Sequence, residues 1–267
     1  MIARIGGRDV GYDDAGTGMP VVFIHGFPHH RGLWAPQVEA LAYRARCIAP
    51  DLAGFGESAP RANGSPASVD AYADDVVALL DEIGIERAVI AGLSMGGYVT
   101  LALWRRHPAR CHALVLADTR AGADDDAGRA KRREMIAQAR AEGTAAVAAS
   151  MLPGMVGRST RERAPELVAR VDAMLRAAPV EAVVGALEAM MSRPDATPML
   201  GDIDVPTLVV VGAEDVLTPP AAARAMAEAI PGARLETIEG AGHVSNLERP
   251  AAFNYVLGEF LAQVDWA

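Results

Sequence analysis

Aromatic residues and cysteine are both scarce in this chain. Phe, Tyr and Trp together make up only 5% of its 267 residues, so aliphatic side chains must build most of the core. The two cysteines, Cys47 and Cys111, are too few for a disulfide framework or a cysteine metal site. Because nothing in this composition requires an oxidising compartment, we expect a cytoplasmic protein.

Long hydrophobic runs and basic clusters are also missing. No run of about 18 apolar residues occurs, so we expect no membrane span. Residues 1–12 contain charges and glycines in place of an apolar stretch, and we expect no signal peptide. The formal net charge is −9, and no basic cluster is interleaved with aromatics. We therefore expect neither a membrane nor a nucleic acid as a partner, and the oligomeric state stays open.

What the chain does contain is an alternation of short apolar runs with helical patterns. Near-continuous apolar runs are typical of parallel strands that are covered on both faces. The predicted strands lie at residues 21–24, 46–49, 88–91, 114–117, 208–211 and 235–238. The predicted helices lie near residues 33–42, 70–83, 96–107, 221–230 and 251–264. This alternation predicts an α/β fold with right-handed crossovers.

One long segment breaks the alternation. Residues 119–199 contain no convincing strand and several helical periods, among them an apolar face within residues 167–175. We predict a core of residues 1–118 and 200–267 with a helical insertion between them. The acidic run Asp124–Asp126 lacks the spaced oxygen ligands of a calcium loop, so we interpret it as a solvated loop or the first turn of a helix.

The segment Gly92–Gly96 fits the pattern G-x-S-x-G and follows a predicted strand directly. A helical pattern follows it. This strand–turn–helix context is the one in which such a serine is a nucleophile. The turn is sharp, and larger residues on either side of Ser94 would clash across it. We therefore predict that Ser94 is a nucleophile raised above the sheet edge at a helix N-terminus.

A serine hydroxyl needs a base to take its proton, and the imidazole needs a carboxylate to orient it. Of the six histidines, His243 lies in a glycine-rich loop that we place at the same sheet edge as Ser94. Asp215 follows a predicted strand, and the chain order Ser, Asp, His is typical of one hydrolase class. We predict His243 as the base and Asp215 as the acid. Asp118 is the main alternative acid, and Glu214 is a weaker one.

A hydrolytic site also needs two N–H groups for the oxyanion. One is the backbone N–H of Met95, which follows the nucleophile. The other is expected in the loop after the first buried strand, where Gly26 allows close approach and Pro28 has no N–H. This leaves Phe27 as the second donor. We expect His25 to be a structural hydrogen bonder beneath the loop, and no metal site, since no third ligand accompanies the histidines here.

Together these motifs resemble the α/β-hydrolase family over nearly the full length of the chain. The matching segments are His25–Pro28, Asp51–Ser58, Gly92–Gly97, Gly212–Asp215 and Gly242–His243. The resemblance implies a triad of Ser94, Asp215 and His243, an oxyanion hole at Phe27 and Met95, a cap domain at residues 119–199, and no metal or organic cofactor. Within the family the chain is most similar to small carboxylesterases and 3-oxoadipate enol-lactonases.

The resemblance also separates this chain from some relatives. Epoxide hydrolases and haloalkane dehalogenases use an aspartate where this chain has Ser94. No Phe, Tyr or Trp occurs between Trp104 and Phe253, and seven of the 11 methionines lie in the expected cap. Flexible thioethers can line an adaptable apolar pocket, although packing within the helices is the alternative interpretation. Under both interpretations we expect aliphatic side chains from the cap to cover the substrate pocket; we call this surface the aliphatic ceiling.

The predicted function is the hydrolysis of carboxylic esters with short to medium acyl chains by a serine nucleophile. The substrate is then a small-molecule ester or lactone. A lactonase, including one for enol-lactones, is the main alternative, because ring opening uses the same machinery. A perhydrolase side activity stays open, since cofactor-free perhydrolases share the triad. A small-molecule receptor on the same fold is the alternative from another class.

Overall fold

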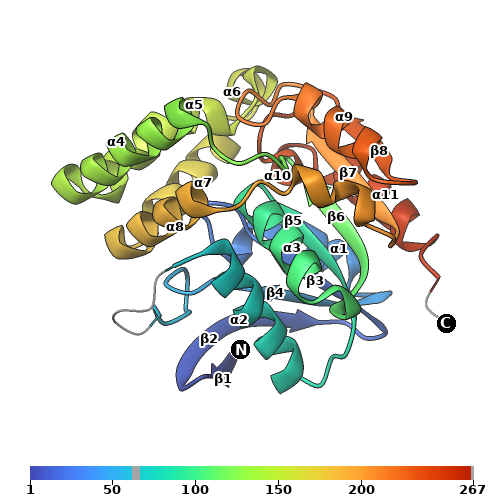
Figure 1. The fold of residues 1–267 in the computed structure, drawn as a ribbon. Coiled ribbons are helices and arrows are strands. Elements are labelled where there is room, and N and C mark those ends of the chain that lie inside the picture. The colour runs from blue at the N-terminus through green and yellow to red at the C-terminus, as the bar shows by residue number, and fades with distance from the viewer. Residues whose placement is uncertain (62–66, 266–267) are drawn as a thin grey trace.

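The computed structural model describes residues 1–61 and 67–265, which form one mostly parallel sheet with helices on both faces (Figure 1). The strands are β1 (Ile2–Ile5), β2 (Arg8–Ala15), β3 (Met19–Ile24), β4 (Ala45–Pro50), β5 (Ala88–Leu93), β6 (Cys111–Ala117), β7 (Thr207–Gly212) and β8 (Arg234–Ile238). Their order across the sheet is β1-β2-β4-β3-β5-β6-β7-β8. The six predicted strands and the α/β fold are thereby confirmed.

Five helices agree with the five predicted ones, and their ends differ from the predicted ends by a few residues. They are α1 (Ala35–Leu41), α2 (Val69–Glu82), α3 (Met95–Arg106), α9 (Pro220–Ala229) and α11 (Pro250–Leu261). The described residues also contain a short helix, α10 (Ser245–Glu248), and the 3₁₀ turns Arg31–Trp34 and Pro108–Arg110; a third 3₁₀ turn, Thr197–Asp202, precedes β7. These helices cover the sheet that positions the site.

The two sheet faces are buried by different helices. Side chains alternate along β3, so that Val22 and Ile24 belong to the apolar cluster with α2 and α3. Val21 and Phe23 belong to the other cluster, with residues of α1 and α11. Because both faces are covered, the central strands are apolar at successive positions, which is the pattern that made them recognisable.

The two N-terminal strands were not predicted. β1 and β2 pair antiparallel at the edge of the sheet, whereas the pairs from β4 to β8 are all parallel. β1 is exposed at alternate positions and contains only four residues. A short strand that is covered on one face carries a much weaker apolar signal than a buried one.

The order of the strands determines where a ligand site can lie. The chain runs from β3 to β4 on one side and then to β5 on the other, so the direction of winding reverses between β3 and β5. Ligands of open α/β sheets bind in the crevice outside the carboxyl ends of the strands at such a reversal. The residues that follow β3 and β5 here are His25 and Ser94.

Between β6 and β7 the chain is helical, and we call this segment the cap. Its helices are α4 (Asp126–Glu142), α5 (Thr144–Met155), α6 (Arg158–Arg163), α7 (Pro165–Arg176) and α8 (Val180–Ser192). They gather over one end of the sheet (Figure 1). The exact division into a core and a cap at residues 119 and 199 stays a prediction. Residues 62–66 and 266–267, which the expected core includes, lie outside the described residues.

No helix in the described part of the chain combines the length and the apolar character that crossing a membrane requires. The cytoplasmic location expected from the composition stays a prediction.

Candidate active site

Ser94 sits in a strained turn between β5 and α3. Its backbone has φ 55° and ψ −114°, a region that non-glycine residues rarely occupy. A Cβ on Gly92 would lie 2.1 Å from the carbonyl oxygen of Gly96, and one on Gly96 would lie 2.1 Å from that of Ile24. The clash across the turn that the sequence predicted is therefore real, and only glycine fits at these two positions.

Neighbouring elements hold the turn in this conformation. The Ser94 N–H donates to the Ala117 carbonyl at 2.9 Å, at the end of β6. The Ser94 carbonyl accepts from the Gly97 N–H at 2.9 Å and from the Thr119 hydroxyl at 2.8 Å. Ser94 is partly exposed, whereas its neighbours in the turn are buried. The strain thus keeps one hydroxyl accessible at the sheet edge.

Three of the predicted site residues meet in one chain of hydrogen bonds. His243 Nε2 lies 2.8 Å from Ser94 Oγ, and His243 Nδ1 lies 2.8 Å from Asp215 Oδ2. A carboxylate can only accept, so the Nδ1–H donates to Asp215 and leaves the Nε2 lone pair for the Ser94 proton. This tautomer is the one in which an imidazole can act as a base toward serine.

The loop after β7 holds Asp215 in place. The backbone N–H groups of Leu217 and Thr218 donate to its Oδ1 at 2.8 and 3.0 Å, and the Thr218 hydroxyl donates to its Oδ2 at 2.6 Å. Burial alone would raise the pKa of Asp215, but the facing His243 and these hydrogen bonds lower it below its ordinary value. Asp215 is therefore ionised when it meets the imidazole.

The environment of His243 favours its protonated form. Burial of the ring, the largest single influence, lowers its pKa. The charge of Asp215, the hydrogen bond to it, and the charges of Asp118 and Glu248 act in the opposite direction and prevail. The pKa of His243 is therefore raised above its ordinary value of about 6.5. Such a ring holds a proton readily once Ser94 has given it up.

Asp118, the alternative acid, is buried close to this group but bonds elsewhere. Its Oδ1 accepts from the Gly212 N–H at 2.8 Å, and its Oδ2 contacts the Ser245 hydroxyl at 2.6 Å. Burial and the nearby Asp215 raise the pKa of Asp118 to about 8. The His243 ring bonds to Asp215, and Asp118 braces the end of β7 against α10.

Glu214, the weaker rival, points away from the imidazole. Its side chain accepts from the backbone N–H of Ser159 at 2.8 Å and from the hydroxyl of Ser159 at 2.5 Å. These contacts are to the cap. Glu214 therefore binds the cap, whereas Asp215, the next residue, binds the imidazole.

The two expected oxyanion donors are Met95, which follows Ser94, and Phe27, which follows Gly26. Met95 is the first residue of α3, so its N–H is among those with no partner inside the helix. The Gly26 carbonyl accepts from the His29 N–H at 3.0 Å and lies 2.9 Å from His25 Nδ1. In a trans peptide the N–H is opposite the C=O, so the Phe27 N–H points away from both groups.

The approach of this loop to Ser94 leaves little room for a side chain at Gly26. A Cβ on Gly26 would lie 3.2 Å from the Ser94 Cβ. His25 supports the loop from below: the Leu52 N–H donates to its Nε2 at 3.0 Å, and its Nδ1 lies 2.9 Å from the Gly26 carbonyl. The prediction that His25 is a structural hydrogen bonder is confirmed.

His29 is a site residue that the sequence reasoning assigned no role. It is only 1% exposed, and neither ring nitrogen has a hydrogen-bond partner among the described residues. Burial and the nearby rings of His25 and His243 lower its pKa to about 3, so the ring is neutral. Its position two residues after Phe27 was the only signal available in the sequence.

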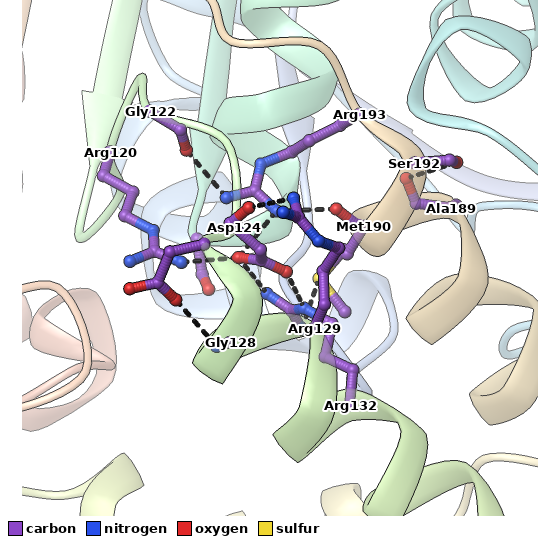
Figure 2. Close-up of polar contacts among 12 residues, drawn as sticks. Arg120, Gly122, Asp124, Gly128, Arg129, Arg132, Ala189, Met190, Ser192 and Arg193 are labelled. Carbon is purple, nitrogen blue, oxygen red and sulfur yellow. Dashed lines mark hydrogen bonds and ion pairs between the residues drawn. The ribbon is translucent and has the colours of Figure 1, made fainter.

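The interpretation of Asp124 as part of a solvated loop is wrong. Its side chain is buried, and it forms ion pairs with Arg120 at 2.6 Å, with Arg193 at 3.0 Å and with Arg132 (Figure 2). These arginines lie at the cap entrance, in α4 and after α8, so only the fold brings them together. Asp125 follows the alternative expectation, because it caps α4 by accepting from the Gly128 N–H.

Several cap methionines pack in the apolar clusters between helices. Met155, Met174 and Met190 are buried within the apolar clusters. For these three, the interpretation as helix core is confirmed. The aliphatic ceiling over the substrate stays a prediction.

No group of three or more His, Cys, Asp or Glu side chains in residues 1–61 and 67–265 is placed to hold a metal ion. The arrangement of Ser94, His243 and Asp215 is the one that acyl transfer by a serine nucleophile requires.

Comparisons with known proteins agree with this architecture. A family model described as the alpha/beta hydrolase fold matches residues 19–250. A thermophilic esterase from Thermogutta terrifontis is 37% identical, with a TM-score of 0.95 and 99% of each chain covered. The enol-lactonase from Burkholderia xenovorans LB400 is 32% identical, with a TM-score of 0.90 and 98% of this chain and 100% of that chain covered.

A second enol-lactonase is also similar to this chain over most of its length. The 3-oxoadipate enol-lactonase 2 of Acinetobacter baylyi is 29% identical over 239 residues, which are 89% of this chain and 86% of the relative. The predicted resemblance to esterases and to 3-oxoadipate enol-lactonases is thereby confirmed. By its strand order, its nucleophile turn and the match over residues 19–250, this chain belongs to the α/β-hydrolase family.

Proposed function

We propose that this protein hydrolyses carboxylic esters of short to medium aliphatic acyl chain through an acyl-enzyme on Ser94. The observation that carries the proposal is the pair of 2.8 Å contacts that join Ser94 to His243 and His243 to Asp215. A serine hydroxyl is a weak nucleophile on its own, and this arrangement activates it.

In the acylation step, Ser94 Oγ attacks the acyl carbon while His243 Nε2 takes the hydroxyl proton. Asp215 stabilises the imidazolium that forms, and it stays ionised. The tetrahedral intermediate then collapses, the bond from the acyl carbon to the alcohol oxygen breaks, and Nε2 returns the proton to that oxygen. The alcohol leaves, and the acyl group remains on Ser94.

In the deacylation step, water replaces the alcohol. His243 Nε2 takes a proton from the water as its oxygen attacks the acyl carbon, and it returns that proton to Ser94 Oγ as the acid is released. In both steps the N–H groups of Met95 and Phe27 stabilise the negative oxygen. These N–H groups stabilise the oxygen effectively because they are already oriented toward it before the negative charge develops.

Lactone hydrolysis is the second candidate, and the enol-lactonases among the relatives favour it. The bonds that form and break are the same, except that the leaving alcohol stays attached to the acyl group. Because the cap arginines at Asp124 are already paired with that residue, we place esters before lactones that carry a free carboxylate.

The deciding experiment measures steady turnover of p-nitrophenyl butyrate by the wild type and by Ser94→Ala. We expect turnover by the wild type and its loss in the variant. Labelling with an organophosphonate, followed by intact mass and peptide mapping, should place one adduct on Ser94. Turnover that survives in Ser94→Ala, or an adduct on another serine, contradicts the mechanism. Binding without any turnover in the wild type supports a receptor instead.

A panel of acyl esters and lactones of graded length then tests the substrate class. We expect acetate and butyrate esters to react faster than bulky aryl-acyl esters, because no aromatic side chain occurs between Trp104 and Phe253. Higher kcat/KM for lactones than for matched open-chain esters would favour the second candidate.

A further inference from the structure

The cap touches the loop that carries His243 through backbone alone at one point. A Cβ on Gly157 would lie 2.8 Å from the Gly242 nitrogen, and one on Gly242 would lie 2.3 Å from the Gly157 nitrogen. Gly157 is the residue before α6, and Gly242 is the residue before His243. The two chain segments can approach this closely only because both residues are glycine.

Glu248 joins the same two segments. Its Oε2 accepts from the Gly157 N–H at 2.8 Å, and its Oε1 accepts from the Gly242 N–H at 2.8 Å and the Val244 N–H at 3.4 Å. The residue is 4% exposed. A carboxylate is suited to this place, because both of its oxygens are acceptors. A glutamine has one acceptor, so its NH₂ group would face a backbone N–H.

A second carboxylate holds the adjoining part of the cap. Glu214, which precedes Asp215, accepts from the backbone N–H and the hydroxyl of Ser159. The loop that carries Asp215 and the short helix α10 that follows His243 therefore each supply a glutamate to cap residues 157–159. Of the two, only Glu248 also bonds to the backbone on both sides of His243.

Four titratable groups surround the His243 ring. Asp215 comes from the loop after β7, Asp118 from the end of β6, His29 from the loop after β3 and Glu248 from α10. Glu248 is one of the three carboxylates whose charge favours the protonated ring. Removing that charge should move the titration of His243 to lower pH, even if the fold is unchanged.

We propose that Glu248 is a positioning residue that holds His243 and cap residues 157–159 in one fixed arrangement. The proposal rests on the ester hydrolysis proposed above. Glu248 acts through the backbone on either side of His243 and through its charge, without touching the substrate. The cap that covers the substrate and the base that activates Ser94 are then positioned by the same side chain.

The test compares pH profiles of kcat/KM for p-nitrophenyl butyrate in the wild type, Glu248→Gln and Gly157→Ala. Glu248→Gln should lower kcat/KM by about tenfold, because small displacements of a catalytic group are costly. Its profile should also shift to lower pH. Gly157→Ala forces the cap away but keeps the Glu248 charge, so kcat/KM should fall while the midpoint stays at the wild-type pH.

The matched control is Gly122→Ala, another glycine of the cap. A Cβ at Gly122 would meet nothing within 4 Å, so this variant should keep the wild-type kcat/KM and pH profile. Glu214→Gln provides a second reference, because it loosens cap residue Ser159 without touching the backbone beside His243. We expect a smaller loss of kcat/KM than in Glu248→Gln and no shift in the pH midpoint.

Two outcomes overturn the proposal. One is a folded Glu248→Gln with wild-type kcat/KM, or with reduced kcat/KM at an unchanged pH midpoint, which makes Glu248 merely structural. The other is a Gly157→Ala as active as Gly122→Ala, which decides the matter if Glu248→Gln does not fold. Failure of the proposed function is recognised separately, because the wild type would then show no turnover or Ser94→Ala would retain it.

Discussion

The central sheet and the cap differ in how far they depend on charged groups. The residues of β5 and β7 are buried and, apart from Thr207, are apolar side chains and glycines packed on both faces. Apolar cap residues such as Met155 and Val183 also pack with the core. In addition the cap depends on charge: Asp124 pairs with three arginines inside it (Figure 2). Glu214 and Glu248 accept from backbone N–H groups of cap residues 157–159. Apolar packing is non-directional and insensitive to pH, whereas these contacts depend on single ionised groups. Changes in the two regions should therefore affect different measured quantities.

The largest effect is expected at the sheet edge, where two carboxylates lie near one imidazole. Asp215→Asn keeps the shape but favours the wrong tautomer of His243, and kcat should fall by on the order of 10⁴, or about 5 kcal/mol of barrier. Asp118→Asn, whose oxygens bond to Gly212 and Ser245, should cost about tenfold or less. Steady-state kinetics on p-nitrophenyl butyrate measure both.

Both variants must give the wild-type circular dichroism spectrum before their rates are compared. If folded Asp118→Asn shows the larger loss while Asp215→Asn stays active, the assignment of the acid is wrong. The roles of Ser94 and His243 would not be affected by that result.

The next effect concerns stability at the cap entrance. Asp124→Asn leaves the buried Arg193 guanidinium without its carboxylate, and breaking such a pair typically costs about 3–5 kcal/mol of unfolding free energy. The exposed Asp126, which pairs with Arg129 on the same helix, is the matched control, and Asp126→Asn should change the denaturation midpoint little. Equal midpoints for the two variants in urea would show that the buried cluster does not stabilise the cap.

Because of the same cluster, the unfolding free energy should depend on pH in the acidic range. Burial of Asp124 alone would raise its pKa, but hydrogen bonds and charges from Arg132 and Arg193 lower it below the ordinary value. A carboxylate with a depressed pKa in the folded state stabilises the protein above its unfolded pKa of about 3.9, and this contribution is lost as pH falls toward the folded pKa. The unfolding free energy of the wild type should therefore fall more steeply below about pH 4 than that of Asp124→Asn.

A smaller effect is expected in the pH profile of the wild type. His243 must be neutral to accept the Ser94 proton, and its pKa is raised above its ordinary value. The kcat/KM should thus rise with pH through one ionisation with a midpoint above about 6.5. A midpoint well below that value would mean that burial of the ring outweighs the carboxylates around it.

The smallest expected effect is that of a chelator. The proposed mechanism activates Ser94 through His243 and Asp215 alone, so incubation with EDTA should leave turnover of p-nitrophenyl butyrate unchanged. A loss of activity that a divalent ion restores would contradict this mechanism.

Much of the sheet and of the candidate site could be predicted because the signals are local. The strand, turn and helix around Ser94 lie within one short stretch of sequence. Gly92 is required by a contact across that turn, and Gly96 by the close approach of β3. Central strands such as β5 are apolar at successive positions. By contrast, β1 and β2 were missed, because neither is apolar and buried throughout: β1 has only four residues, exposed at alternate positions, and β2 is buried at only three of its eight residues.

The sequence by itself determined the fold family, the nucleophile turn and the set of candidate acids, since each depends on residues close together in the chain. Only the tertiary structure decided which carboxylate meets the His243 ring, because Asp215 and Asp118 both follow strands that end at the same edge. It alone brought Arg193 to Asp124 and Glu248 to Gly157, whose partners are distant in sequence. A hydrogen bond or ion pair between distant residues leaves no periodicity in the sequence, and it exists only once packing has brought the two groups together.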